Sequence, residues 1–211
     1  MSTEMSPAQL MLLTQWLSPS FPVGAFSYSH GLELALSEQP ELDVEAWLGD
    51  VLRHGAGRND AIFLRVAYDG DVEGADAMGR ALAPSSERLL EADAQGRAFC
   101  KALSGAFGIE LGTLIYPVAL GAAARAKTLP LEPLVEIYLH SFISNLIAAA
   151  QRLSPLGQTR AQAAVARLAP VCAEMAEATR GLGLDDLGGC AWAADAAAMR
   201  HETQETRIFR T

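Results

Sequence analysis

The amino-acid sequence predicts an all-α fold: a single-domain helical bundle of about eight to ten helices with a polar C-terminal tail. Apolar residues recur at helical intervals along most of the chain, and no stretch shows the sustained alternation of period two that indicates a sheet. The composition, 50% hydrophobic and 19% charged, argues against disorder. A length of 211 residues suits one domain with a sizeable core, which we place at residues 1–199, before a tail of residues 200–211.

The first two helices are predicted from capping residues and prolines. Ser6-Pro7 supplies an N-cap and a first helical residue, and Ser18-Pro19 ends that helix. The segment Pro22-Val23-Gly24 forms a turn before a second helix from about Tyr28 to Ser37. A serine hydroxyl, of Ser27 or Ser29, is expected to cap the second helix.

The same signals predict the remaining helices. In chain order they are residues 44–54 with Asp43 as N-cap, a helix opened by Asn59-Asp60, a weaker helix over 71–83, a long helix capped by Ser86, a small-residue helix over 117–127, the most apolar helix over 131–153, a helix after Gly157 that Pro170 kinks or breaks, and a last helix over 184–199.

Charge and cysteine content narrow the class of protein. A net charge of -9 makes general binding to nucleic acid or to anionic membranes unfavourable. The chain begins without a secretory signal pattern and contains no apolar run of about 18 residues, so we predict a cytoplasmic protein. Its low charged fraction favours an oligomer or a partner that covers apolar surface. The odd, widely spaced Cys100, Cys172 and Cys190 predict packed thiols, with neither a disulfide framework nor a metal pair.

The stretch Ser27-Tyr28-Ser29-His30-Gly31 poses a choice between a nucleophile and a structured loop. A nucleophile elbow requires G-x-S-x-G between a strand and a helix. Here Ser27 stands where the first glycine belongs, and a loop built on Pro22 and Gly24 precedes the motif. No acid or base partner can be assigned to Ser29 from the sequence, so these residues favour a capped helix start over a catalytic serine.

A second stretch, His201-Glu202-Thr203-Gln204-Glu205, resembles the zinc-protease pattern H-E-x-x-H with Glu205 in place of the second histidine. It lies close to the end of the sequence, where a buried catalytic helix is not expected. No phosphate-binding glycine loop followed by lysine is present in the sequence. From the residues alone we therefore assign no catalytic constellation, no cofactor and no stable metal site.

Three segments together resemble one known family. Residues 21–35, FPVGAFSYSHGLELA, are similar to its N-terminal motif LPVGxxSxSxGLExA. Residues 200–210, RHETQETRIFR, look like its C-terminal RHETQxxRLFRS, and RLSPLGQ at 152–158 is similar to its K/R-L-x-P-x-G-Q. The order and spacing also fit, so the chain resembles the family of the urease accessory protein UreF. It departs from the pattern at Ala25, Phe26 and Thr211, which concerns only details of loop shape.

The resemblance implies a protein that is not an enzyme and acts as a nickel-insertion chaperone during urease maturation. The implied protein is all-α, cytoplasmic and homodimeric, and it holds no permanent metal or cofactor. Its implied partners are UreD, also called UreH, and the GTPase UreG. The family member bridges these two proteins on apo-urease and modulates GTP turnover.

The resemblance also implies a partner-binding surface, made of the N-terminal loop and a tail that becomes ordered on binding UreD. Arg152 and Gln158 would lie near the dimer or the UreG-facing surface. His30, His201 and Glu205 are candidates for transient nickel ligands, and the simpler interpretation is that they are hydrogen-bonded interface residues. The predicted partner-binding residues are Pro22, Gly24, Phe26, Ser27, His30, Gly31, Glu33, Arg152, Gln158, His201, Glu202, Gln204, Arg207, Ile208, Phe209 and Arg210.

Two alternatives from other classes stay open at this point. One is a serine hydrolase with Ser29 as nucleophile. The other is a helical adaptor that is unrelated to urease.

Overall fold

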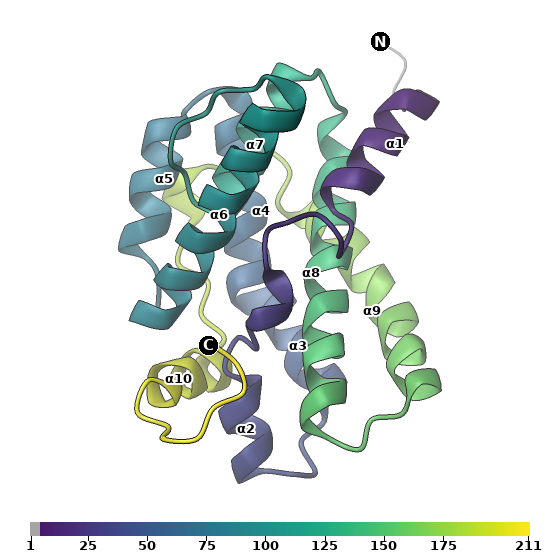
Figure 1. The fold of residues 1–211 in the computed structure, drawn as a ribbon, viewed down its shortest axis with the longest axis vertical. Helices are drawn as coiled ribbons and strands as arrows, with labels where there is room; N and C mark the ends of the chain where they lie inside the picture. The colour runs from purple at the N-terminus through teal and green to yellow at the C-terminus, as the bar shows by residue number, and fades with distance from the viewer. Residues whose placement is uncertain (1–4) are drawn as a thin grey trace.

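A computed structural model describes residues 5–211 and shows the predicted all-α fold (Figure 1). The described residues contain ten α-helices, two short 3-10 helices and no strand. The α-helices are α1 (Pro7–Trp16), α2 (Leu32–Glu38), α3 (Val44–His54), α4 (Ala56–Asp69), α5 (Val72–Ala81), α6 (Ser86–Phe107), α7 (Tyr116–Ala126), α8 (Leu131–Leu153), α9 (Gln158–Ala178) and α10 (Trp192–His201). The 3-10 helices are η1 (Ala25–Ser27) and η2 (Leu184–Asp186).

Several helix starts confirm the capping predictions. Ser6 caps α1 through the backbone N–H of Gln9, and the Gln9 side chain accepts the Ser6 N–H in return, which makes a capping box. Asp43 caps α3 by accepting the N–H groups of Glu45 and Ala46. The long apolar helix predicted over residues 131–153 is α8, with the same bounds.

Other predicted boundaries were wrong because the backbone or a distant contact intervenes. The second helix begins at Leu32 and not at Tyr28, since His30 and Gly31 have φ angles of 59° and 81° that no right-handed helix contains. Its N-cap is Gly31, although the Ser29 hydroxyl still accepts the N–H of Glu33 at 3.2 Å. The cap of α6 is Ser85, one residue before the predicted Ser86.

Asn59-Asp60 do not open α4, which begins at Ala56 directly after the end of α3. The Asn59 side chain instead binds the backbone of Gly189, donating to its carbonyl oxygen at 3.0 Å and accepting its N–H at 3.3 Å. The predicted last helix is also interrupted. Gly188 has a φ of 121°, and residues 187–191 separate η2 from α10.

Pro170 does not break α9, which runs through it without interruption. Proline removes one backbone hydrogen bond, and the exposed position of Pro170 lets water satisfy the carbonyl that is left over. The cysteines are free as predicted, with Cys100 on α6 and Cys172 on α9 both buried.

Close contacts between helices produce the core. Helix α4 packs extensively on α7, and α8 on α9 (Figure 1). At Gly121 of α7, an added Cβ would lie 2.2 Å from the carbonyl oxygen of Leu64 on α4, so only glycine allows this approach. Helix α8 is the one described helix long and apolar enough to cross a membrane. However, half of its most apolar window is buried within the fold, as expected of a core helix.

Candidate functional site: a surface built from both terminal motifs

The C-terminal residues fold back onto the N-terminal motif, and the contact between Ser29 and Thr211 spans 182 positions of the sequence. The yellow tail in Figure 1 loops beside α10 and ends next to the segment that leads into α2. The Arg210 N–H donates to the carbonyl of Ser27 at 2.9 Å, and the Ser29 N–H donates to the carbonyl of Thr211 at 3.0 Å. The two motifs that define the resemblance therefore form one unit, which we call the motif–tail cluster, residues 21–33 and 200–211.

Ser29 holds this cluster together, and its hydroxyl is not accessible as a nucleophile. Its side chain is fully buried, and its hydroxyl donates to the Thr211 carbonyl oxygen. The Ser29 hydroxyl oxygen in turn accepts the Glu33 N–H at the start of α2. A hydroxyl with both roles filled inside the protein meets no substrate, so the geometry opposes the hydrolase alternative.

Glu33 is the main anchor of the tail. Its carboxylate is buried and accepts the backbone N–H groups of Ile208 at 2.7 Å and Phe209 at 2.8 Å. One of its oxygens also lies 3.2 Å from Nε2 of His201. A carboxylate that is removed from water needs such donors, and here the tail backbone supplies two of the three groups.

His201 lies at the end of α10 between two carboxylates. Its Nδ1 is 2.7 Å from an oxygen of Glu87 on α6, and its Nε2 faces Glu33. Because an ionised carboxylate can only accept, both bonds form together only if both ring nitrogens carry protons or one carboxyl group is protonated. Arg207 of the tail pairs with the second oxygen of Glu87, so charges of both signs alternate across the cluster.

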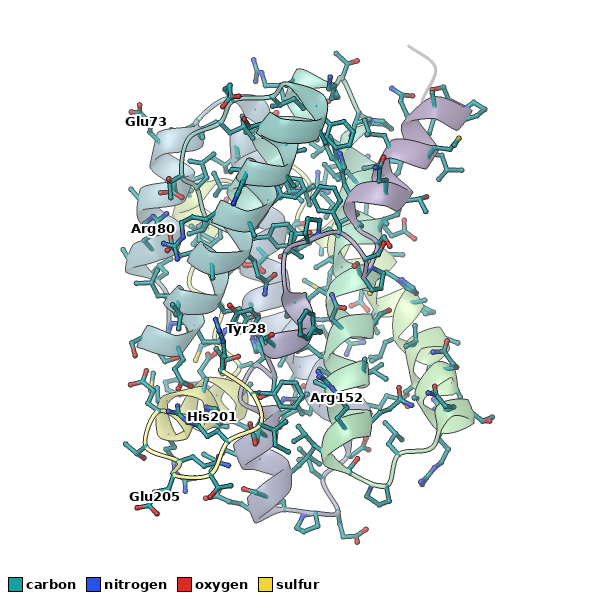
Figure 2. The ribbon with its side chains drawn as sticks, viewed as in Figure 1. Tyr28, Glu73, Arg80, Arg152, His201 and Glu205 are labelled. Atoms are coloured by element: carbon teal, nitrogen blue, oxygen red, sulfur yellow. The ribbon has the colours of Figure 1, made fainter. Side chains whose placement is uncertain are left out.

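The residues after His201 turn outward before the chain returns. An oxygen of Glu202 accepts the N–H and hydroxyl of Ser86, both at 2.7 Å, at the start of α6. The Ser86 hydroxyl bond is the main reason that the pKa of Glu202 lies below its usual value. Figure 2 shows Glu205 at the outer edge of this loop and His201 inside it. Since α10 ends at His201, His201 and Glu205 do not share a helix face, which removes the geometry of a zinc-protease motif.

Arg152, near the end of α8, joins the cluster from a third element (Figure 2). Its guanidinium donates to the carbonyl of Phe26 and lies 4.3 Å above the ring of Phe209, a cation–π contact. Gln158, predicted alongside it, is an exposed residue at the start of α9, with no hydrogen bond to the cluster among the described residues. The structure thus brings Arg152 into the site and leaves Gln158 outside it.

The exposed part of the cluster has the composition of a binding surface. Phe26 is 67% exposed and Ile208 is 72% exposed, although both are large apolar residues. Arg210 is also exposed, and its side chain makes no hydrogen bond or ion pair with the described residues. Pro22 and Gln204 lie at the margin, exposed and half-buried, and Gly24 supports the turn with a φ of 74°. We call Phe26, Ile208 and Arg210 the motif–tail surface.

His30 lies beneath this surface. It is 2% exposed, packs edge-on against the ring of Phe142 and has a φ of 59°. Burial, and secondarily the charge of Arg88, lower the pKa of His30 well below its usual value. The described residues contain no group of three or more His, Cys, Asp or Glu side chains that could hold a metal ion, so His30, His201 and Glu205 do not form a metal centre.

Sequence reasoning missed the polar groups that support the tail from α6. Glu91 pairs with Arg88 and accepts the Thr211 hydroxyl at 3.0 Å. The side chains of Glu91 and Arg88 also line a cavity of about 90 Å³ that reaches the half-buried Asp60. Burial raises the pKa of Asp60 to about 6, although the Tyr138 hydroxyl donates to it. The acidic and basic residues of α6 at helical spacing were the available signal, but they equally fit an exposed helix face.

The fold and this site define a class of protein: an all-α protein whose two terminal motifs bind each other and leave apolar and basic side chains exposed. The family model for UreF matches residues 40–169, more than half of the chain. The chain is 48% identical to a urease accessory protein UreF of Roseobacter denitrificans, over 98% of this chain and 96% of the relative. It is 50% identical to one from Cereibacter sphaeroides, over 97% and 99%, and 43% identical to one from Ruegeria pomeroyi, over 96% and 97%.

The chain therefore belongs to the UreF family of urease accessory proteins. This membership confirms the predicted resemblance, and it contradicts the alternative of a helical adaptor unrelated to urease.

Proposed function

We propose that this protein bridges the GTPase UreG and the accessory protein UreD (UreH) on apo-urease, and that it modulates GTP turnover while nickel is inserted. It acts as a cytoplasmic homodimer and as a chaperone without catalytic residues of its own. Nickel is its cargo and not a resident cofactor. The observation that carries this proposal is the motif–tail cluster, in which the two family motifs are hydrogen-bonded to each other and leave Phe26, Ile208 and Arg210 exposed.

The polar groups of the cluster support a binding role. The carboxylates of Glu33 and Glu87 and the hydroxyl of Ser29 are all directed at other parts of the chain. What they leave exposed is Phe26, Ile208 and Arg210. Two apolar groups beside a free guanidinium match the residue types that dominate binding energy at protein interfaces.

The docked tail changes how binding to UreD is expected to work. The sequence predicted a tail that becomes ordered on binding, with the loss of entropy that ordering carries. In the structure, Phe209 and Thr211 are already buried and the tail backbone is fixed by Glu33. We infer that UreD meets a preformed surface, so less of the binding free energy is lost to ordering.

The effect on GTP turnover acts through contact with UreG, since the sequence has no phosphate-binding loop. Among the three candidates for transient nickel contact, Glu205 is exposed, while His30 and His201 are buried. A passing nickel ion would therefore meet Glu205 first. The two histidines support the cluster in its docked state.

The direct test is a double substitution, Ile208→Ala with Arg210→Ala. Both side chains are exposed, and the Arg210 backbone bond to Ser27 is retained in alanine, so the fold is preserved. We expect the affinity for purified UreD, measured by calorimetry, to fall by roughly tenfold or more. Met11→Ala, which removes an apolar side chain that is 73% exposed on α1, is the control and should bind normally. Unchanged UreD affinity in the double variant would contradict the proposed role of this surface.

A further inference from the structure

A second exposed feature lies at the other end of α10 from the tail. Residues of α3, the start of α4 and the segment before α10 line a groove of about 900 Å³. Trp192, the first residue of α10, stands at this groove with 83% of its surface exposed. Trp47 of α3 also lines the groove and is half-buried. Tryptophan is one of the residue types that most often dominate the binding energy of protein interfaces.

The groove is preformed, because close backbone contacts fix its wall. Asn59 holds Gly189 through two hydrogen bonds, and a Cβ on Gly189 would lie 2.6 Å from the carbonyl oxygen of His54. At Gly55, an added Cβ would lie 2.7 Å from that of Ala191. These glycines let the segment before α10 lie directly on the end of α3. A ligand that enters the groove therefore meets fixed groups.

Hydrogen-bond donors without partners collect around this groove. Helix α10 has no side-chain cap, and the N–H groups of Trp192, Ala193 and Ala194 bind no described residue. The indole N–H of Trp47 is buried and has no hydrogen-bond partner. Arg58 donates to the Asp186 carbonyl but forms no ion pair within the described residues. These groups call for acceptors, and the positive end of the helix dipole and the guanidinium favour a negative charge.

The remaining charges near the groove limit the ligand further. Arg53 is paired with Glu174 at 3.4 Å, and the Asp186 carboxylate accepts the Gly183 N–H. Asp50 is exposed at the groove and adds a negative charge. With a net charge of -9 on the chain, a polyanion such as nucleic acid is repelled, whereas a single carboxylate can reach the donors. The two indoles offer apolar contact to a side chain next to that carboxylate.

We propose that this groove is a second docking site, which takes a short acidic segment of a partner protein. A carboxylate of that segment binds Arg58 and the free N–H groups of α10, and a neighbouring apolar side chain packs between Trp47 and Trp192. The inference rests on the proposed bridging function, for which a protein needs two separate surfaces. The groove and the motif–tail surface lie at opposite ends of α10, about 15 Å apart along its axis.

The test measures binding of UreG and of UreD separately, by calorimetry at low and high salt. Trp192→Ala and Arg58→Glu should each lower the affinity for one partner by tenfold or more, and leave the other partner unaffected. Binding of the affected partner should weaken as salt rises. Leu90→Ala on α6, where the side chain is 46% exposed away from the groove, should bind both partners normally. Unfolding temperatures confirm that the variants are folded.

Normal affinity of the Trp192→Ala variant for both partners would overturn the inference, whatever the Arg58→Glu variant does. A loss with Trp192→Ala but not with Arg58→Glu would overturn the acidic character of the segment. A further experiment adds inorganic phosphate and measures the indole fluorescence. Quenching by phosphate that is abolished in Arg58→Glu would assign the groove to a phosphate ligand instead of an acidic segment. If the Ile208→Ala/Arg210→Ala variant loses UreD while the groove variants bind normally, this inference fails and the proposed function stands.

Discussion

The helical core and the motif–tail cluster are stabilised by different forces. The core between α4, α7 and α8 is apolar and close-packed, with side chains such as Leu64, Leu120 and Leu134 fully buried. At the centre of the cluster, buried polar groups hold the tail: His201 lies between Glu33 and Glu87, and Glu33 also accepts two N–H groups of the tail backbone. Packing energy is spread over many contacts, whereas the cluster depends on a few bonds.

This difference has a functional meaning under the proposed role. A close-packed core keeps one shape, since displacing any helix opens cavities throughout it. A segment that a few charge-assisted bonds hold can instead open locally while the core stays folded. The comparison therefore predicts that damage to the core unfolds the whole protein, and that damage to the cluster frees only the tail.

The largest effect is expected at Gly121, where α7 contacts α4. Gly121→Val places side-chain atoms where the carbonyl oxygen of Leu64 lies 2.2 Å from an ideal Cβ, and a backbone oxygen cannot rotate away. We expect the free energy of unfolding to fall by about 3 kcal/mol or more, as measured by urea denaturation. The whole transition should shift, since the two helices must separate.

Gly105→Ala on α6 is the matched control. No atom lies within 4 Å of a Cβ at Gly105, so the methyl group meets open space. This change should leave the protein equally stable or stabilise it by up to about 1 kcal/mol, because alanine favours helix. Equal destabilisation by the two substitutions would contradict the role assigned to close packing at Gly121.

A smaller and local effect is expected at Glu33. Glu33→Ala leaves the N–H groups of Ile208 and Phe209 and one nitrogen of His201 without their acceptor. Breaking a buried charged network of this kind costs about 3 kcal/mol. We expect this loss to lower the free energy of docking the tail and not that of folding the core. Amide hydrogen exchange should show lost protection at residues 208 and 209, with protection in α7 and α8 retained.

Glu38→Ala on the same helix separates this effect from a general loss of charge. Within residues 5–211, Glu38 pairs only with Arg200, at the surface, and exposed ion pairs contribute little to stability. In the Glu38→Ala variant, the backbone amides of residues 208 and 209 should keep the protection from hydrogen exchange that they have in the unmodified protein. If Glu33→Ala also left that protection unchanged, the tail would be held by its apolar contacts, and the comparison between core and cluster would fail.

The sequence was most informative where structure depends on nearby residues. The bounds of α8 and the caps Ser6 and Asp43 follow from local patterns, and the structure has them as predicted. The start of α2 could not be predicted, because two successive left-handed residues, His30 and Gly31, override an apolar helical pattern. Long-range contacts were also invisible: no local signal shows that Asn59 binds Gly189 instead of capping α4.

The site followed the same division. The motif residues could be recognised from the sequence. The role of Ser29 as a structural hydroxyl also agrees with the interpretation that the sequence favoured. That the tail docks on Glu33 depends on pairing across 175 residues, for which a single sequence holds no pattern. From the sequence, Glu87 and Glu91 resemble an ordinary charged helix face, since their tail partners Arg207 and Thr211 lie 120 residues further along the chain.

The last prediction concerns Asp60, a carboxyl group of α4 that lies where the core meets the cluster. Burial raises its pKa from 3.8 to about 6, so the folded protein favours the neutral form. Well below its unfolded pKa of 3.8 the carboxyl group is protonated in both the folded and the unfolded state, so it does not lower the stability of the fold. As the pH rises from about 4 to 6, the unfolded chain ionises this group first, and the contribution of Asp60 to stability falls.

Asp60→Asn should therefore stabilise the protein at neutral pH. The asparagine side chain can still accept the Tyr138 hydroxyl, which is 2.7 Å from Asp60, and it carries no charge to bury. The gain in the free energy of unfolding should be near zero at pH 4, grow between pH 4 and 6, and level off above pH 7 at about 3 kcal/mol or less. Urea denaturation of both proteins across this range measures it. A gain that does not change with pH, or a loss at pH 7, would show that ionised Asp60 is stabilised by Arg88, and the polar groups of the cluster would then extend into the core.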